Sequence, residues 1–297
     1  MKSYVIAVDQ STSATKALLF DEEGTLLNNV SIAHRQYYPR EGWVEHDPGE
    51  IYANTVKSIR EVVTGYDGEF SLALTNQRET VVVWERATGR PVYNAVVWQC
   101  LRGKDICDRL KAGGWSELVK ERSGLLIDPY FAGSGAKWIL DNVEGAREAA
   151  VRGELCMGTI DSWLVFRLTS GRVHATDYTN ASRTMLFNIH TLDWDDDLLR
   201  MLTIPRSMMP ELRPSDAEYG ETTVEGLFPE PIRIAGVLGD SHGALAGQMC
   251  FAEGLGKVTY GTGSSVMVNI GERPSDPPRR LSDVCGLCRP RQGFLRL

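Results

Sequence analysis

Two stretches near opposite ends of the chain share one pattern, in which a turn of small, hydroxyl-bearing residues separates two short apolar strands. The first covers residues 4–20 and has its turn at Asp9-Gln-Ser-Thr-Ser-Ala-Thr-Lys16. The second covers residues 257–270 and has its turn at Gly261-Thr-Gly-Ser-Ser265. Apolar strands on both sides of such a turn predict a β-hairpin. The repetition indicates an internal duplication of a hairpin whose turn faces a ligand.

These turns suit a phosphate ligand, because Gly, Ser and Thr offer an oxyanion unhindered backbone N–H groups and hydroxyl donors. The sequence contains no GxxxxGK[ST] loop, which disfavours a P-loop nucleoside triphosphatase. The turn at Gly261 lacks the third glycine of a dinucleotide fingerprint and leads into a strand, which disfavours a nicotinamide oxidoreductase. Plain tight hairpins are the alternative interpretation of each turn taken alone.

Strand and helix patterns alternate between the two hairpins, which predicts an α/β fold. Asp47 can cap a helix, Pro48 suits its first position, and Glu50 occupies the reciprocal capping-box position. Apolar residues then share one helical face, at Ile51, Tyr52, Val56, Ile59 and Val63. Strands are expected at residues 72–74, 81–84, 95–98 and 232–239.

The composition is that of a folded globular protein, with 297 residues, of which 42 % are hydrophobic and 24 % charged. The net charge of −7 and the absence of a Lys/Arg run argue against nucleic acid or an anionic membrane surface as a partner. The first apolar run, Tyr4 to Val8, is too short for a signal peptide or a membrane span. Six scattered cysteines fit a reducing compartment, so the expected location is the cytoplasm.

Two aspartates stand directly after apolar strands. Asp9 is placed to hold a hydrated Mg²⁺ at the end of its strand, with an Asx-turn as the alternative. Asp240 follows the strand at 232–239 and precedes a predicted helix over residues 241–248. Phosphoryl transfer to an alcohol needs a carboxylate that orients the hydroxyl and accepts its proton, and Asp240 is the candidate for that base. Its alternative role is a helix N-cap.

A small polyol needs polar partners for its hydroxyls and a flat apolar wall for its carbons. Arg78 and Glu79, between two predicted strands, offer five N–H donors and a carboxylate acceptor. Trp98 and Tyr130 are candidates for the wall. The alternatives are a solvated surface pair for the charged residues and ordinary core positions for the aromatic ones.

Together these residues resemble the FGGY carbohydrate kinases, and the glycerol kinases most of all, over residues 4 to about 271. The stretches that carry the resemblance are residues 43–48, 76–80, 93–100, 127–131, 137–138, 158–164 and 176–187. The resemblance implies an actin-like ATPase (ribonuclease H-like) fold with two domains around a cleft. Residues 1–249 would form a complete polyol-binding domain, and residues 250–297 the start of a truncated nucleotide-binding domain.

The resemblance also implies the reaction and its residues. ATP would phosphorylate glycerol to glycerol 3-phosphate, with Mg²⁺ as the metal cofactor. Asp240 would be the catalytic base and Asp9 would organise the metal. Polyol contacts would come from Arg78, Glu79, Trp98, Tyr130, Asp240 and Ser241. Phosphate contacts would come from Thr12, Ser13, Gly261 and Thr262.

Three departures from the glycerol kinase pattern bear on the substrate and on activity. Ser241-His242 stands where two glutamines are usual, which alters the outer hydroxyl contact. Ser265 stands in the place of an aromatic residue that packs on the glycerol carbons in the family, which is expected either to make room for a longer polyol or to leave a wetter pocket. Residues from about Arg279 to Leu297 do not resemble the family, so turnover by this chain alone is expected to be impaired. A kinase for another polyol or sugar, and a non-catalytic fragment that binds a polyol or a partner, are the alternatives, and a homo-oligomer stays open.

Overall fold

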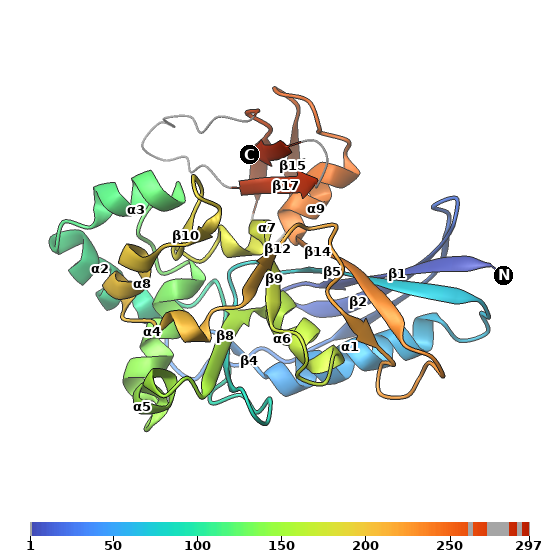
Figure 1. Ribbon diagram of the computed structural model, residues 1–297, viewed down its shortest axis with the longest axis horizontal. Helices are drawn as coiled ribbons and strands as arrows, with labels where there is room; N and C mark the ends of the chain where they lie inside the picture. The colour runs from blue at the N-terminus through green and yellow to red at the C-terminus, as the bar shows by residue number, and fades with distance from the viewer. Residues whose placement is uncertain (1, 261–263, 272–284, 290–292, 297) are drawn as a thin grey trace.

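The computed structural model describes residues 2–260, 264–271, 285–289 and 293–296. Its largest sheet has six strands in the order β13-β14-β5-β1-β2-β3 (Figure 1). Strands β5 and β14 run parallel to β1, whereas β2 is antiparallel to β1 and β3 is antiparallel to β2. In chain order the strands are β1 (Ser3–Gln10), β2 (Ala14–Asp21), β3 (Leu26–Ala33), β5 (Glu69–Asn76), β13 (Glu221–Thr222) and β14 (Ile232–Gly239).

A smaller sheet of four strands, in the order β4-β7-β6-β8, lies beside the large one. Its strands are β4 (Glu45–His46), β6 (Val81–Glu85), β7 (Ala95–Val96) and β8 (Leu155–Thr159). Four two-stranded pairs complete the described strands: β9 (Ala175–Asp177) with β12 (Glu211–Arg213), β10 (Phe187–Asn188) with β11 (Asp193–Trp194), β15 (Gly256–Thr259) with β16 (Ser265–Val268), and β17 (Cys285–Arg289) with β18 (Gly293–Arg296).

The helices cover these sheets on different sides. Figure 1 shows α1 (Pro48–Val62) and α6 (Ile160–Leu168) against one face of the large sheet, and α9 (Asp240–Gly247) on the opposite side. The remaining described helices are α2 (Lys104–Ala112), α3 (Ser116–Ser123), α4 (Ala132–Asn142), α5 (Ala146–Val151), α7 (Tyr178–Ala181), α8 (Asp196–Leu202) and two short 3₁₀ turns at Leu101–Gly103 and Arg206–Met208.

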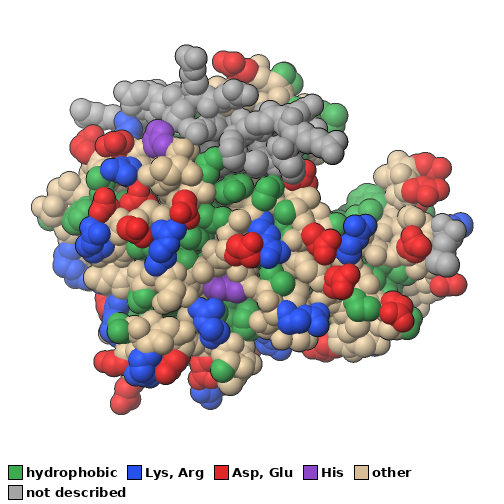
Figure 2. All heavy atoms as spheres, viewed as in Figure 1, with side chains coloured by type: hydrophobic (Ala, Val, Ile, Leu, Met, Phe, Trp, Pro, Cys, Tyr) green, Lys and Arg blue, Asp and Glu red, His purple; other side chains and the backbone are tan. Residues whose placement is uncertain are grey.

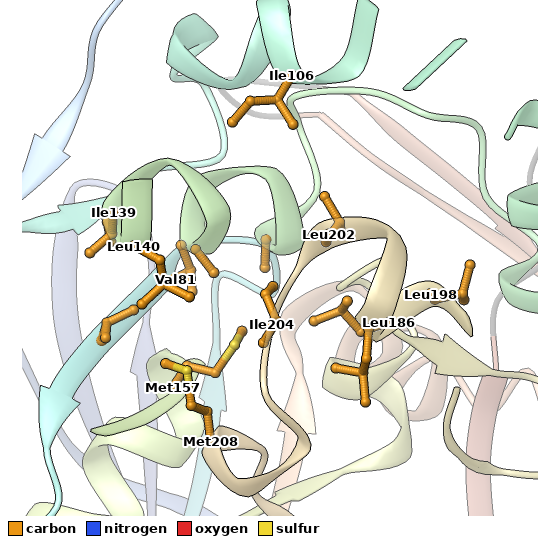
Figure 3. Close-up of a cluster of buried hydrophobic side chains, with 14 of the residues drawn as sticks. Val81, Ile106, Ile139, Leu140, Met157, Leu186, Leu198, Leu202, Ile204 and Met208 are labelled. Carbon is orange, nitrogen blue, oxygen red and sulfur yellow. The ribbon is translucent and has the colours of Figure 1, made fainter. Parts of the chain in front are cut away.

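Each sheet has its own hydrophobic core. Between the large sheet and helices α1 and α6 lie side chains such as Ile6, Ile59 and Trp163, all fully buried. The second core joins the smaller sheet to α4 and α8, and Val81 and Leu202 both belong to the cluster shown in Figure 3. Two adjoining cores give the segments between the sheets a rigid base.

Helix α1 follows most of its sequence signals. The Asp47 side chain accepts a hydrogen bond from the Gly49 N–H at 2.7 Å, and Pro48 is the first helical residue. The predicted apolar face is buried. The prediction that Glu50 forms the reciprocal capping-box bond is wrong, because its carboxylate accepts a hydrogen bond from the Arg35 N–H at 3.0 Å instead.

The boundary between β14 and α9 also differs from its prediction in one respect. The strand covers residues 232–239 as expected. Gly239, with φ −64° and ψ 143°, occupies the cap position, and Asp240 is the first helical residue. The N-cap interpretation of Asp240 is therefore wrong, and its carboxylate is left for other partners.

On the face shown in Figure 2, acidic and basic side chains of the described residues are interspersed. The described residues therefore form no patch of purely positive or purely negative charge on this face. Within the described part of the chain, every helix is too short or too polar to cross a bilayer.

Candidate functional site

The carboxyl ends of β1, β5 and β14 meet at one edge of the large sheet. In the sheet register Asp9 pairs with Thr75 and Gly239 pairs with Asn76. The turn after β1, the segment 77–80 after β5 and the start of α9 after β14 therefore lie next to one another. This is the edge at which open α/β sheets bind ligands.

A cluster of charged side chains occupies this edge. Arg78 Nε lies 3.0 Å from Asp240 Oδ1, and Arg78 Nη2 lies 3.7 Å from Glu79 Oε1. On its other side Glu79 Oε1 accepts a hydrogen bond from Arg183 Nε at 2.7 Å. Arg78 is 6 % exposed and Glu79 is 4 % exposed, so the solvated surface pair considered for them is wrong. Buried charges that are paired in this way are held in a fixed geometry.

An aromatic wall adjoins the charged cluster. The rings of Trp98 and Tyr130 meet edge to face, with 5.5 Å between their centroids. Burial raises the pKa of Tyr130 to about 12, and the neighbouring Glu79 carboxylate adds to the rise, so the hydroxyl stays protonated at neutral pH. The Trp98 indole N–H donates to Thr12 Oγ1 at 2.9 Å, which joins the wall to the hydroxyl-rich turn after β1.

Asp240 is the most open member of the cluster, with 44 % of its side chain exposed. Partial burial raises the pKa of its carboxyl, the Arg78 guanidinium opposes that rise, and the Glu79 carboxylate adds to it. The Ser241 N–H donates to Asp240 Oδ1 at 2.5 Å, which places Ser241 directly beside it. A carboxylate with a raised pKa is a better proton acceptor than an ordinary surface aspartate.

Asp9 faces the same space as Asp240. The two residues line a cavity of about 610 Å³ together with Thr75 and Ser215. Lys16 Nζ lies 3.6 Å from Asp9 Oδ2. Burial raises the pKa of Asp9, Lys16 opposes the rise, and the Asp240 carboxylate adds to it, so the two acids act on each other.

Asp9 and Asp240 are two carboxylates in this cavity that could bind a metal ion. In the part of the chain that the structure describes, no three His, Cys, Asp or Glu side chains converge as a metal cage. Mg²⁺ usually takes only one or two protein carboxylates and completes its shell with waters and substrate phosphates. Asp9 and Asp240 facing one cavity are compatible with a hydrated Mg²⁺ of this kind.

Most of the predicted site residues are thus brought together. Thr12 is half-buried under the aromatic wall, and Ser13 is exposed on the same turn. Gly261 and Thr262 lie outside the described residues. Their hairpin is confirmed by the antiparallel pairing of β15 with β16, which packs against α9.

Two residues of the site were missed from the sequence. Arg183 completes the buried pairing of Glu79, and His242 Nδ1 lies 3.3 Å from Arg78 Nη1. Both stand inside stretches that the sequence analysis singled out, but neither has a local pattern that indicates its partner.

A buried polar network beneath the site was also missed. Asp177 accepts hydrogen bonds from the hydroxyls of Thr179 and Ser215, each at 2.7 Å. The Thr179 hydroxyl in turn accepts the Gly239 N–H at 2.8 Å. Asn180 accepts from the Asn76 side chain at 3.0 Å. The network therefore fixes the ends of both β14 and β5, from which Asp240 and Arg78 project.

Known proteins are similar to this chain in both sequence and fold. Residues 4–247 match the family model described as "FGGY family of carbohydrate kinases, N-terminal domain". Glycerol kinase 1 of Thermotoga maritima is 53 % identical over 281 residues, which cover 93 % of this chain and 57 % of that protein. The glycerol kinase of Citrobacter koseri is 51 % identical over 276 residues, which cover 92 % of this chain and 55 % of that protein. The chain thus spans little more than half the length of these relatives.

Solved structures agree. The glycerol kinase of Plasmodium falciparum with ADP superimposes with a TM-score of 0.94 at 32 % identity, over 99 % of this chain and 60 % of that one. The gluconate kinase of Lactobacillus acidophilus, at a TM-score of 0.86 and 21 % identity, shares the fold. The predicted α/β, actin-like ATPase fold is confirmed. The chain belongs to the FGGY family of carbohydrate kinases.

Proposed function

We propose that this chain supplies the polyol-binding half of an ATP-dependent kinase that converts glycerol to glycerol 3-phosphate. One observation carries the proposal: Arg78, Glu79 and Asp240 form a continuous charged cluster beside the Trp98–Tyr130 wall. Residues 1–249 are proposed as the polyol domain and residues 250–297 as the start of the nucleotide domain. The family match over residues 4–247 supports that boundary.

The cluster matches the chemistry of a small polyol. Arg78 offers N–H donors to the hydroxyls, and Glu79, which is paired with Arg78 and Arg183, offers a carboxylate acceptor. The faces of Trp98 and Tyr130 suit the carbon chain. Ser241, beside Asp240, is proposed as the contact for the outer hydroxyl. Because Arg78 and Glu79 are buried and paired, they are positioned before the substrate arrives.

Asp240 is proposed as the general base. Its carboxylate accepts the proton of a polyol hydroxyl, whose oxygen forms a bond to the γ-phosphorus of ATP. The bond from that phosphorus to the β-γ bridging oxygen breaks, and the electron pair leaves with ADP. Arg78, 3.0 Å from Asp240, holds the carboxylate in place and favours its ionised form.

The phosphates are assigned to the hairpin turns. Thr12 and Ser13 in the first turn, and Gly261 and Thr262 in the second, are proposed to contact them through hydroxyl and N–H groups. Lys16 adds a cation next to Asp9. Asp9, which lines one cavity together with Asp240, would hold Mg²⁺, which when bound neutralises phosphate charge.

The proposed location is the cytoplasm, where ATP is supplied. Four described cysteines, Cys100, Cys107, Cys156 and Cys250, are buried free thiols, which supports a reducing compartment. The proposed partners are the polyol and ATP, and no nucleic acid or membrane.

Calorimetric titration of the chain with glycerol, erythritol and xylitol tests the binding half of this proposal. Glycerol is expected to bind, and Arg78→Met to abolish the heat while circular dichroism shows a native fold. Detection of glycerol 3-phosphate after incubation with ATP and Mg²⁺ tests the transfer half. A folded sample that binds none of the polyols would refute the assignment of the site.

A further inference from the structure

Lys257 is a buried cation at the edge of the proposed site. It lies on β15 and is 6 % exposed. Its Nζ donates to Thr259 Oγ1 at 2.8 Å and to Ser265 Oγ at 3.3 Å. Both partners are neutral hydroxyls, and within the described residues no carboxylate oxygen lies within ion-pair distance of this ammonium group. Lysine is very seldom buried in this way without an anion.

The surroundings of Lys257 connect it to the proposed reaction centre. Strand β15 packs against α9, which begins at Asp240. Burial lowers the pKa of Lys257, the Arg78 guanidinium lowers it further, and the Asp240 carboxylate raises it.

The balance of charge around Lys257 favours an anionic ligand. An ammonium group has three N–H donors, and two of those of Lys257 go to the hydroxyls of Thr259 and Ser265. The positive charge of Arg78 opposes the charged form of Lys257, whereas an anionic ligand would stabilise it. A phosphoryl group is such an anion, and lysine binds phosphate as a point charge.

We propose that Lys257 is a further catalytic residue, whose ammonium group contacts the oxygens of the phosphoryl group during transfer and remains in contact with the phosphate of the product. This inference rests on the proposed function. The polyol oxygen bonds to phosphorus, the bond to ADP breaks with its electron pair, and Asp240 takes the proton. Lys257 stays protonated throughout and stabilises the negative charge. Thr259 and Ser265 are positioning residues that hold its Nζ.

Calorimetry that compares glycerol with sn-glycerol 3-phosphate tests this role, because the two ligands differ by the phosphate that Lys257 would contact. Lys257→Met is expected to leave the Kd for glycerol within about twofold of the wild-type value. It is expected to raise the Kd for glycerol 3-phosphate by about tenfold to a hundredfold, which is the usual effect of losing a charged hydrogen bond. Lys257→Arg, which keeps the charge, is expected to recover part of the loss. Ser265→Ala should raise the Kd for glycerol 3-phosphate by a smaller factor than Lys257→Met does.

Lys137→Met is the matched control, because it removes the same charge from a lysine that pairs with Asp141 at 3.0 Å. It is expected to change neither affinity. If Lys257→Met weakens the binding of both ligands by the same factor, or of neither, the role proposed for Lys257 is wrong while the polyol site stands. If the folded wild-type chain binds neither ligand, the proposed function fails first and the Lys257 role falls with it.

Discussion

Nδ1 of His242 lies 3.3 Å from Nη1 of Arg78, inside the protein. A guanidinium group has only donors, so in this contact Nδ1 is the acceptor and the ring hydrogen of a neutral His242 resides on Nε2. The contact joins the first turn of α9 to the segment between β5 and β6, in parallel with the ion pair of Arg78 and Asp240. His242 thereby helps to orient the guanidinium proposed to meet the polyol.

Replacing His242 by a residue without an acceptor should loosen Arg78. His242→Leu is expected to weaken glycerol binding by about threefold to thirtyfold, because a buried guanidinium N–H loses its partner. His242→Asn places a carbonyl oxygen near the position of Nδ1 and should recover most of the affinity. Calorimetry measures both. Equal losses in the two variants would show that the ring, and not its acceptor, matters.

Gly239 leaves the space through which the Arg78 side chain passes. A Cβ atom added there would lie 2.5 Å from Arg78 Cδ, too close for any real contact. Gly239→Ala should therefore displace Arg78 and weaken glycerol binding by at least about tenfold, in line with the loss of a charged hydrogen bond.

Gly247, at the end of the same helix, has nothing within 4 Å of the equivalent atom. Gly247→Ala is thus the control and should keep full affinity, with an unfolding free energy equal to or up to about 1 kcal/mol above that of the wild type. Urea unfolding gives the stability of Gly239→Ala and Gly247→Ala, and calorimetry gives their affinity for glycerol. Unchanged glycerol binding in Gly239→Ala would mean that Arg78 does not hold the ligand.

Asp161 should make stability depend on pH. It is fully buried, and burial together with the Asp177 carboxylate raises the pKa of its carboxyl to about 7. Between about pH 4 and pH 7 the unfolded chain has released this proton and the native chain retains it, so the free energy of unfolding falls as pH rises through that window and levels off above it.

Asp161→Asn removes this titration. Its unfolding free energy relative to the wild type should therefore increase between pH 4 and pH 8, by up to about 4 kcal/mol. Urea unfolding of both proteins at the two pH values gives the difference. A difference that does not change with pH would mean that Asp161 titrates with an ordinary pKa in the native state.

Local sequence signals predicted the elements that carry the site. The β1–β2 hairpin, α1 and β14 follow from alternation, capping and apolar runs within a few residues of one another. Asp240 was found because it follows β14, and Asp9 because it follows the apolar run Tyr4–Val8, although the structure extends β1 to Gln10 and so places Asp9 inside the strand. The resemblance to known kinases supplied the roles.

The site contacts that the sequence analysis missed join residues far apart in the sequence. The Arg183–Glu79 bond joins residues 104 positions apart, and the Arg78–His242 contact spans 164 positions. No periodic pattern encodes such pairs. The same cause explains the capping error at Glu50, since a contact with Arg35 from outside the helix replaced the local bond.

A crystal structure of the chain grown with glycerol tests the central claim most directly. The account predicts one ordered glycerol whose hydroxyls lie within hydrogen-bond distance of Arg78, Glu79 and Asp240, with its carbons against Trp98. Glycerol ordered elsewhere, with these three side chains still paired only to protein groups at a saturating concentration, would contradict it.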